Sequence, residues 1–186
     1  MSRGIVVLWV ALLMSGCAST ASVPVAPVQG WPTANWTLQG RIGIQTEAQN
    51  ASGTLFWQHR ERSDELLLTS PLGQGVARIV VNADGASLDM PNQPLRQAAD
   101  IESLTRETLG YALPVSGLVW WVQALPAPNS AHGIRRDDVG RLAQLKQDGW
   151  VIEYHYADAA STRPGKLWVT REGLEIRLVT DSWLVE

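Results

Sequence analysis

Short runs in which apolar and polar residues alternate dominate this chain and constrain its fold. In the run that begins at Trp36, the apolar residues Trp36, Leu38, Ile42 and Ile44 fall on one face, and mostly polar residues fall on the other. Such alternation is typical of a strand with one buried face. Similar runs follow at 53–60, 65–70, 76–82, 86–90, 141–146, 150–156, 166–171 and 174–179.

Turn dipeptides separate several of these runs. Asp84-Gly85, Asp148-Gly149 and Glu172-Gly173 each stand between two consecutive runs, which is typical of a hairpin. The pattern therefore predicts an antiparallel meander. We expect the short final run, 182–185, to close one edge of the sheet, and we expect the segment 127–139 to be a long loop.

Two helical patterns interrupt the meander. The first follows Asp100, a residue type that is favoured as an N-cap, and stops at Gly110; its apolar face carries Ile101, Leu104 and Thr108. The second begins near Ser116 and ends at Pro126; its apolar face carries Leu118, Trp121, Val122 and Leu125. Strands on both sides of two helices predict a mainly β fold, with α-helices laid over the concave side of a curved antiparallel sheet.

The amino-terminal segment indicates a lipid anchor. Arg3 precedes the apolar run 5–14, which is too short to span a bilayer, and Ser15-Gly16 then leads directly to Cys17, the only cysteine. This order resembles the bacterial lipobox, in which the cysteine thiol receives a diacylglyceryl group. We therefore expect a lipoprotein signal peptide at 1–16, lipid attachment at Cys17, a flexible tether at 17–30 and one domain at 31–186. An ordinary secretory signal with an unrelated cysteine is the alternative.

Several function classes are disfavoured by composition and motifs. A net charge of −3 without a basic run argues against a nucleic-acid partner, and a single cysteine cannot form an internal disulfide. His59, His132 and His155 have no second ligand at metal spacing, and neither a nucleophile elbow nor a phosphate-binding loop occurs. The sequence therefore predicts no metal, no cofactor, no catalytic residue and no enzymatic activity.

An apolar surplus points to a different kind of site. Leu66, Leu67 and Leu68 make both faces of one strand apolar, and the loop that follows carries Leu72 between Pro71 and Gly73. A leucine at such a tip either folds back on the sheet edge or meets an apolar partner, and the residues alone leave both possibilities open.

The sequence resembles the family of the outer-membrane lipoprotein receptor LolB. The resemblance rests on Leu38-Gln39-Gly40-Arg41, on Phe56-Trp57-Gln58, on the stretch from Leu67 to Gly73, on the helix end from Trp121 to Pro126, and on Asp181-Ser182-Trp183-Leu184-Val185. It implies a half-open antiparallel β-barrel, with helices over its mouth, that accepts acylated lipoproteins from the periplasmic carrier LolA and inserts them into the outer membrane without nucleotide hydrolysis.

The resemblance also implies residue roles, partners and a location. Pro71, Leu72 and Gly73 match the membrane insertion loop of the family, and Ala18 after the acylated cysteine fits an outer-membrane resident. The implied partners are LolA, acylated lipoprotein cargo and outer-membrane phospholipid. We expect a monomer that is lipid-anchored at the periplasmic face of the outer membrane.

A cavity for acyl chains is the physical requirement of that function. A chain of about sixteen carbons costs on the order of 12 kcal/mol in water, so the cargo has to stay shielded. From alternation and helical spacing we expect the cavity to be lined by Ile42, Ile44, Leu66, Leu68, Leu104, Leu118, Trp121 and Val122. The alternatives are a structural outer-membrane lipoprotein that docks a protein partner with a filled core, and a lipid-modifying enzyme, for which no nucleophile and base can be paired.

Overall fold

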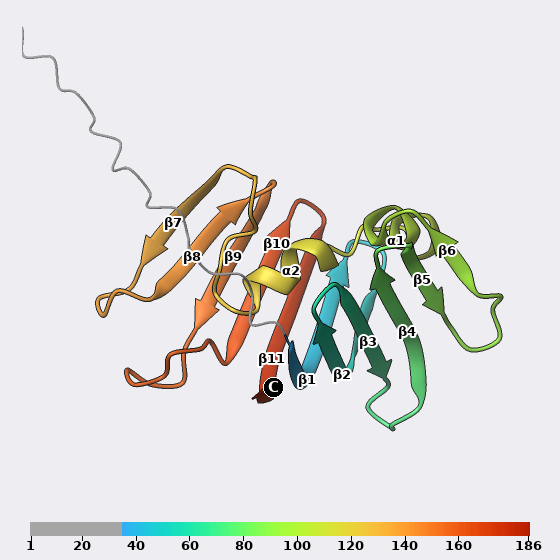
Figure 1. The fold of residues 1–186 in the computed structure, drawn as a ribbon, viewed down its shortest axis with the longest axis horizontal. Coiled ribbons are helices and arrows are strands. Elements are labelled where there is room, and N and C mark those ends of the chain that lie inside the picture. The colour runs from blue at the N-terminus through green and yellow to red at the C-terminus, as the bar shows by residue number, and fades with distance from the viewer. Residues whose placement is uncertain (1–34) are drawn as a thin grey trace, which may run out of the picture.

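The computed structural model describes residues 35–186. The predicted signal peptide, Cys17 and the predicted tether lie outside the described residues. Within 35–186, eleven strands form one antiparallel sheet in the order β6-β5-β4-β3-β2-β1-β11-β10-β9-β8-β7 (Figure 1). The strands are β1 Asn35–Thr46, β2 Asn50–Arg60, β3 Ser63–Thr69, β4 Gly75–Asn82, β5 Gly85–Asp89, β6 Arg96–Ala98, β7 His132–Arg136, β8 Leu142–Gln147, β9 Trp150–His155, β10 Lys166–Arg171 and β11 Leu174–Val185.

The first and last strands are neighbours in the middle of this sheet. β1 pairs with β2 on one side and with β11 on the other, from Ile44 opposite Ile176 to Trp36 opposite Val185. The prediction that 182–185 closes a sheet edge is therefore wrong, because this run is the second half of β11. A register shift opposite Gln39 and Gly40 interrupts the alternation of β11, and the strand continues beyond it.

The predicted inner face of β1 is confirmed. Trp36, Leu38, Ile42 and Ile44 are all buried in one apolar core. Gly40 lies on the same face, where an added Cβ would stand 2.2 Å from the carbonyl oxygen of Val179. Glycine at this position therefore allows the backbones of β1 and β11 to approach closely on the inner side of the sheet.

The first helix, α1 Ile101–Leu109, has the predicted ends and packs against β5 and β6. The carboxylate of Asp100 accepts a hydrogen bond of 2.8 Å from the backbone N–H of Ser103, and Gly110 adopts a positive φ of 86°. The buried threonine is Thr105 rather than Thr108. Its hydroxyl donates to the carbonyl oxygen of Ile101 and accepts from the N–H of Leu113, so a polar residue can occupy the buried face of the helix.

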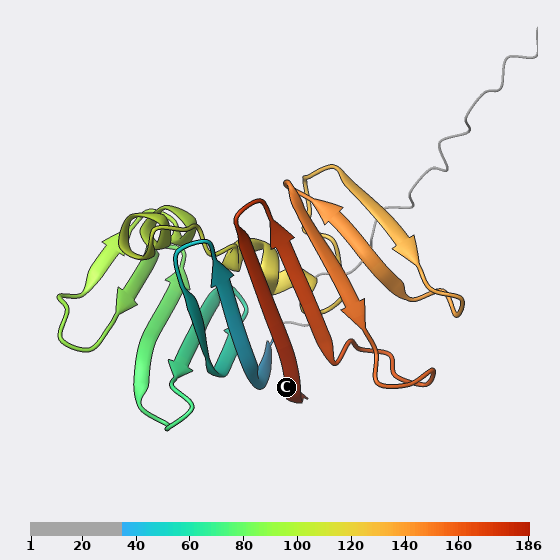
Figure 2. The ribbon, with the colours of Figure 1, turned by 180° about the vertical axis from the view of Figure 1, so that it is seen from behind.

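The second helix, α2 Val115–Trp121, is shorter than predicted. It stops at Trp121 because the chain turns through Ala124, which has a φ of 57°, so that Leu125 lies outside the helix. α2 lies across the middle of the sheet, whereas α1 lies near the β5 and β6 end (Figures 1 and 2). The two helices thus cover different parts of the curved sheet. No helix in the described range is long and apolar enough to cross a membrane.

The two edge strands were missed by the sequence pattern. β7 occupies part of the segment that was expected to be a loop, and it carries His132, Arg135 and Arg136. β6 is only three residues long. Both strands are short and largely polar, as is common at sheet edges, so neither shows the apolar alternation by which the inner strands are recognised.

Candidate functional site

An apolar cavity lies between α2 and the sheet. Its volume is about 10 Å³, which is room for roughly one water molecule and far below the ~300 Å³ or more of a usual ligand site. Its walls are entirely apolar side chains: Ile42, Leu55, Trp57, Leu66, Leu68, Leu113, Leu118, Ile176 and Leu178. The cavity therefore holds almost no free space in this structure, and Leu113 and Leu118 are the wall residues that do not come from the sheet.

The structure brings half of the eight predicted cavity residues together. Ile42, Leu66, Leu68 and Leu118 line the cavity. The other four are buried in the surrounding core but do not line it: Ile44 and Leu104, together with Trp121 and Val122.

Sequence reasoning missed five residues of the cavity wall. Leu55 and Trp57 alternate within one predicted run, and Ile176 and Leu178 alternate within another, so their common face could have been found by pairing the runs. Leu113 lies in an irregular segment between the helices, where no periodic signal marks it.

A buried hydrogen-bonded contact fastens the end of α2 to the sheet. The indole N–H of Trp121 donates to Oε1 of Gln147 on β8 at 2.9 Å, and Gln147 also exchanges two hydrogen bonds of 2.8 Å with the backbone of Ala127. The Trp121 ring packs beside Trp150, with ring centroids 6.2 Å apart. It also lies over Gly117, where an added Cβ would stand 2.6 Å from the ring. Trp121 thus holds α2 in place rather than lining the cavity.

A second buried cluster fixes one wall of the cavity. The indole N–H of Trp57 donates to the carboxylate of Asp64 at 2.7 Å, and Nδ1 of His59 lies 2.9 Å from the same oxygen. Trp36 stacks on His59 at 5.1 Å and on Trp183 at 4.6 Å. His59 therefore has a structural role, and the cluster orients the Trp57 ring toward the apolar space. Among the described residues no group of His, Cys, Asp and Glu could hold a metal ion.

The β3–β4 loop presents an exposed leucine. The backbone N–H of Ser70 donates to the carbonyl oxygen of Gln74, and the N–H of Gly73 donates to the carbonyl oxygen of Ser70, so hydrogen bonds close the loop. Gly73 adopts a positive φ of 79°, which favours glycine at this position. Leu72 is 88% exposed. Of the two possibilities that the sequence left open, the structure excludes a leucine folded back on the sheet edge.

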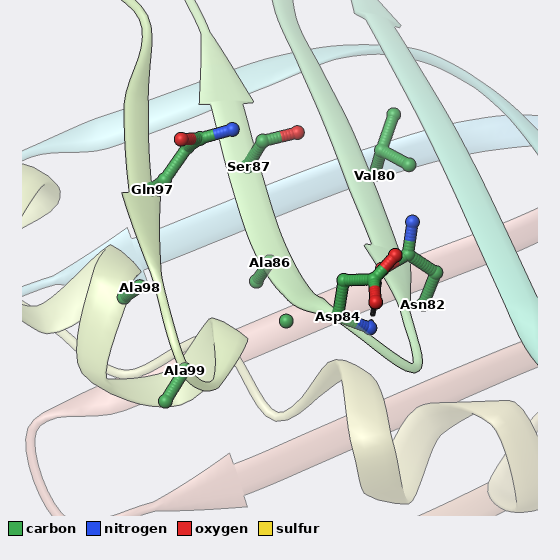
Figure 3. A pocket seen from close by; sticks show the side chains of 9 residues that line it. Val80, Asn82, Asp84, Ala86, Ser87, Gln97, Ala98 and Ala99 are labelled. Carbon is green, nitrogen blue, oxygen red and sulfur yellow. Dashed lines mark hydrogen bonds between the residues drawn. The ribbon is translucent and has the colours of Figure 1, made fainter.

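A larger hollow elsewhere is polar and open. It has a volume of about 560 Å³ and lies beside the β4–β5 turn, β6 and the start of α1. Figure 3 shows Asn82, Asp84, Ser87 and Gln97 around it, and the backbone N–H of Asp84 donates to Oδ1 of Asn82. Such a lining suits water rather than an acyl chain, so size alone does not identify the site.

Known proteins resemble the chain over nearly its whole length. A family model described as outer membrane lipoprotein LolB matches residues 34–183. The outer-membrane lipoprotein LolB of Thiobacillus denitrificans is 51% identical over 183 residues, which cover 98% of each chain. The protein of the same name from Pseudomonas aeruginosa PAO1 is 38% identical over 185 residues, which cover 92% of this chain and 90% of the relative.

A solved structure shares the fold. The crystal structure of a putative outer membrane lipoprotein-sorting protein domain from Vibrio parahaemolyticus superposes with a TM-score of 0.50. The match covers 85% of this chain and 87% of the other at 8% identity, so it supports the architecture alone.

Proposed function

Because the chain belongs to the family of the outer-membrane lipoprotein LolB, we propose that it is a lipid-anchored outer-membrane protein that receives lipoproteins from the carrier LolA and inserts them into the membrane. It acts as a monomer and without an enzymatic step. The observation that carries the proposal is Leu72, which is 88% exposed at the tip of a hydrogen-bonded loop. An exposed leucine on an ordered loop fits contact with the apolar part of a bilayer.

The apolar cavity supports the receiving step. Its walls come from the sheet, from Leu113 and from Leu118 on α2, so displacement of α2 would enlarge the cavity at the cost of the hydrogen bond between Trp121 and Gln147. Removing an acyl chain of about sixteen carbons from water yields on the order of 12 kcal/mol, from which the cost of moving α2 is subtracted. In the proposed cycle α2 is the lid, and the cargo chain replaces it against the sheet.

The lipid anchor is proposed at Cys17, which is the only cysteine of the chain. Labelled palmitate should enter the wild-type protein and should not enter Cys17→Ala. Label in that variant would contradict the proposed attachment site. The folded domain should be unchanged, because Cys17 precedes the first strand by many residues.

Delivery is tested by Leu72→Glu, with Leu72→Met as the apolar control. The glutamate variant should fold normally, because a change at an exposed loop tip shifts stability by only about 0.5 kcal/mol. It should still accept cargo from LolA, because Leu72 is not in the cavity wall. Transfer from the receptor to liposomes should fail in Leu72→Glu and continue in Leu72→Met. Equal transfer rates for both variants would refute a membrane role for this loop.

The small volume of the cavity favours one rival function. A structural lipoprotein that docks a protein partner would need no acyl-binding space, and a cavity of about 10 Å³ is compatible with a filled core. An environment-sensitive apolar dye distinguishes the two functions. The proposed receptor should bind the dye and release it when fatty acid is added, whereas a protein with a filled core should not bind it.

A further inference from the structure

The end of β11 carries apolar side chains that the core does not use. Leu184 is 60% exposed and Val185 is 40% exposed, whereas Leu174, Ile176 and Leu178 of the same strand are buried. Leu184 and Val185 follow each other in the strand and so point to opposite faces of the sheet, and because the core covers neither of them at the strand end, they stabilise the fold little and can contact an apolar partner.

This strand end lies beside the point at which the anchored segment joins the domain. β1 begins at Asn35, Trp36 pairs with Val185, and the backbone N–H of Glu186 donates to the carbonyl oxygen of Asn35 at 3.1 Å. Residues 18–34 separate Cys17 from Asn35, and a chain of this length reaches at most about 60 Å. An anchor at Cys17 therefore keeps the domain within that distance of the bilayer, and the anchored segment joins the domain beside the end of β11.

The Leu72 loop lies on the same side of the molecule. Figures 1 and 2 show the β3–β4 loop and the carboxyl end of β11, which is marked C, along the lower side in both views. The turn between β10 and β11 lies at the opposite end of β11, on the upper side. The loop and the strand end can thus approach one surface together, and that turn then points away from it.

Two ion pairs lie near the strand end. Arg60 binds Glu186 at 2.8 Å, and Arg41 binds Asp181 at 2.8 Å. Approach of a membrane interface therefore brings two neutral ion pairs toward the low-dielectric region, together with the Arg163 guanidinium, which lies 5.0 Å from the centroid of the Trp183 ring.

From this arrangement we propose that Leu184 and Val185 form a second membrane contact, which together with the Leu72 loop sets the orientation of the domain on the bilayer. The occupant of this surface is the lipid interface of the membrane that holds the anchor. The inference rests on the proposed function and adds a contact to it. One inserted loop leaves the domain free to tilt in any direction, whereas two separated contacts restrict its tilt to rotation about the line that joins them.

A site-specific probe tests the second contact in the full-length acylated protein. Once Cys17 is acylated, a cysteine introduced by Leu184→Cys is the only free thiol, and it can carry a polarity-sensitive fluorophore. The protein is reconstituted in vesicles of phosphatidylethanolamine and phosphatidylglycerol that contain a brominated lipid as quencher. Leu72→Cys is the reference for membrane contact, and Glu172→Cys, in the exposed β10–β11 turn, is the control for a residue that faces water.

We expect the probes at positions 184 and 72 to be quenched several-fold more strongly than the probe at 172, with an unchanged thermal unfolding midpoint for each variant. Quenching at 72 but not at 184 would overturn the second contact and leave the proposed function intact. Quenching at neither position would overturn both the second contact and the proposed delivery role of Leu72.

Discussion

Truncation of Trp121 tests whether α2 is fastened to the sheet as described. Trp121 is 1% exposed, and a tryptophan side chain buries about 200 Å² on folding. At about 25 cal/mol per Å², loss of this contact is worth at most about 5 kcal/mol, and measured Trp→Ala changes in cores cost about 3 to 5 kcal/mol. Trp121→Ala should therefore lower the free energy of unfolding by about 3 to 5 kcal/mol in urea titrations.

The matched variant Trp121→Phe separates packing from hydrogen bonding. It keeps an aromatic ring but removes the indole N–H, which donates a hydrogen bond of 2.9 Å to Oε1 of Gln147. Oε1 of Gln147 still accepts from the N–H of Ala127, so it is not left unpaired, and the expected cost is only about 1 kcal/mol. If Trp121→Ala lowered the free energy of unfolding by less than the ~1 kcal/mol expected for Trp121→Phe, α2 would not be packed on the sheet. Its role as a lid would then be refuted.

Three further substitutions test other parts of the fold. Asp64→Ala should cost about 3 kcal/mol in urea titrations, and Asp64→Asn should cost less because it keeps one acceptor for the buried ring nitrogens. Gly117→Ala should destabilise despite the better helix propensity of alanine, because its Cβ would stand 2.6 Å from the Trp121 ring; a stability gain would contradict that packing. The hydrogen bond from the backbone N–H of Ser103 lowers the pKa of Asp100. The contribution of the Asp100 carboxylate to the stability of the fold should therefore be complete above the usual carboxyl pKa and lost as the pH falls through the lowered pKa. A stability difference between the wild type and Asp100→Ala that persists in strong acid would contradict this.

Alternation was a reliable guide to the inner strands, for a physical reason. A strand with one face on a core has to place every second side chain there, and Trp36, Leu38, Ile42 and Ile44 are all buried as expected. The ends of α1 were also predictable, because Asp100 and Gly110 satisfy backbone groups locally. The full length of β11 was not, because a register shift breaks the two-residue period on which the prediction depends.

The site was only partly predictable, because a periodic pattern marks burial but not the neighbour of a buried side chain. Leu118 and Trp121 belong to the same helical stripe, yet Leu118 borders the cavity and Trp121 reaches Gln147 on β8. The sequence predicted that Leu72 lies at a loop tip, but the orientation of the Leu72 side chain depends on how hydrogen bonds close the loop. Backbone hydrogen bonds between Ser70, Gly73 and Gln74 determine this orientation, and they cannot be predicted from the local amino-acid composition.

The cost of opening the cavity beneath α2 has a consequence for the direction of transfer. Opening α2 costs free energy that is subtracted from the affinity for an acyl chain, and each 1.4 kcal/mol of opening cost weakens binding about tenfold. The bilayer has no such cost, because its interior accepts an acyl chain of about sixteen carbons for the whole of the roughly 12 kcal/mol gained on leaving water. In the proposed cycle the contacts that hold α2 over the sheet, above all Trp121 with Gln147, therefore favour release of cargo into the membrane. Closure of the lid and the passage of cargo onward are thus coupled through the same residues, and no nucleotide is needed to give the transfer its direction.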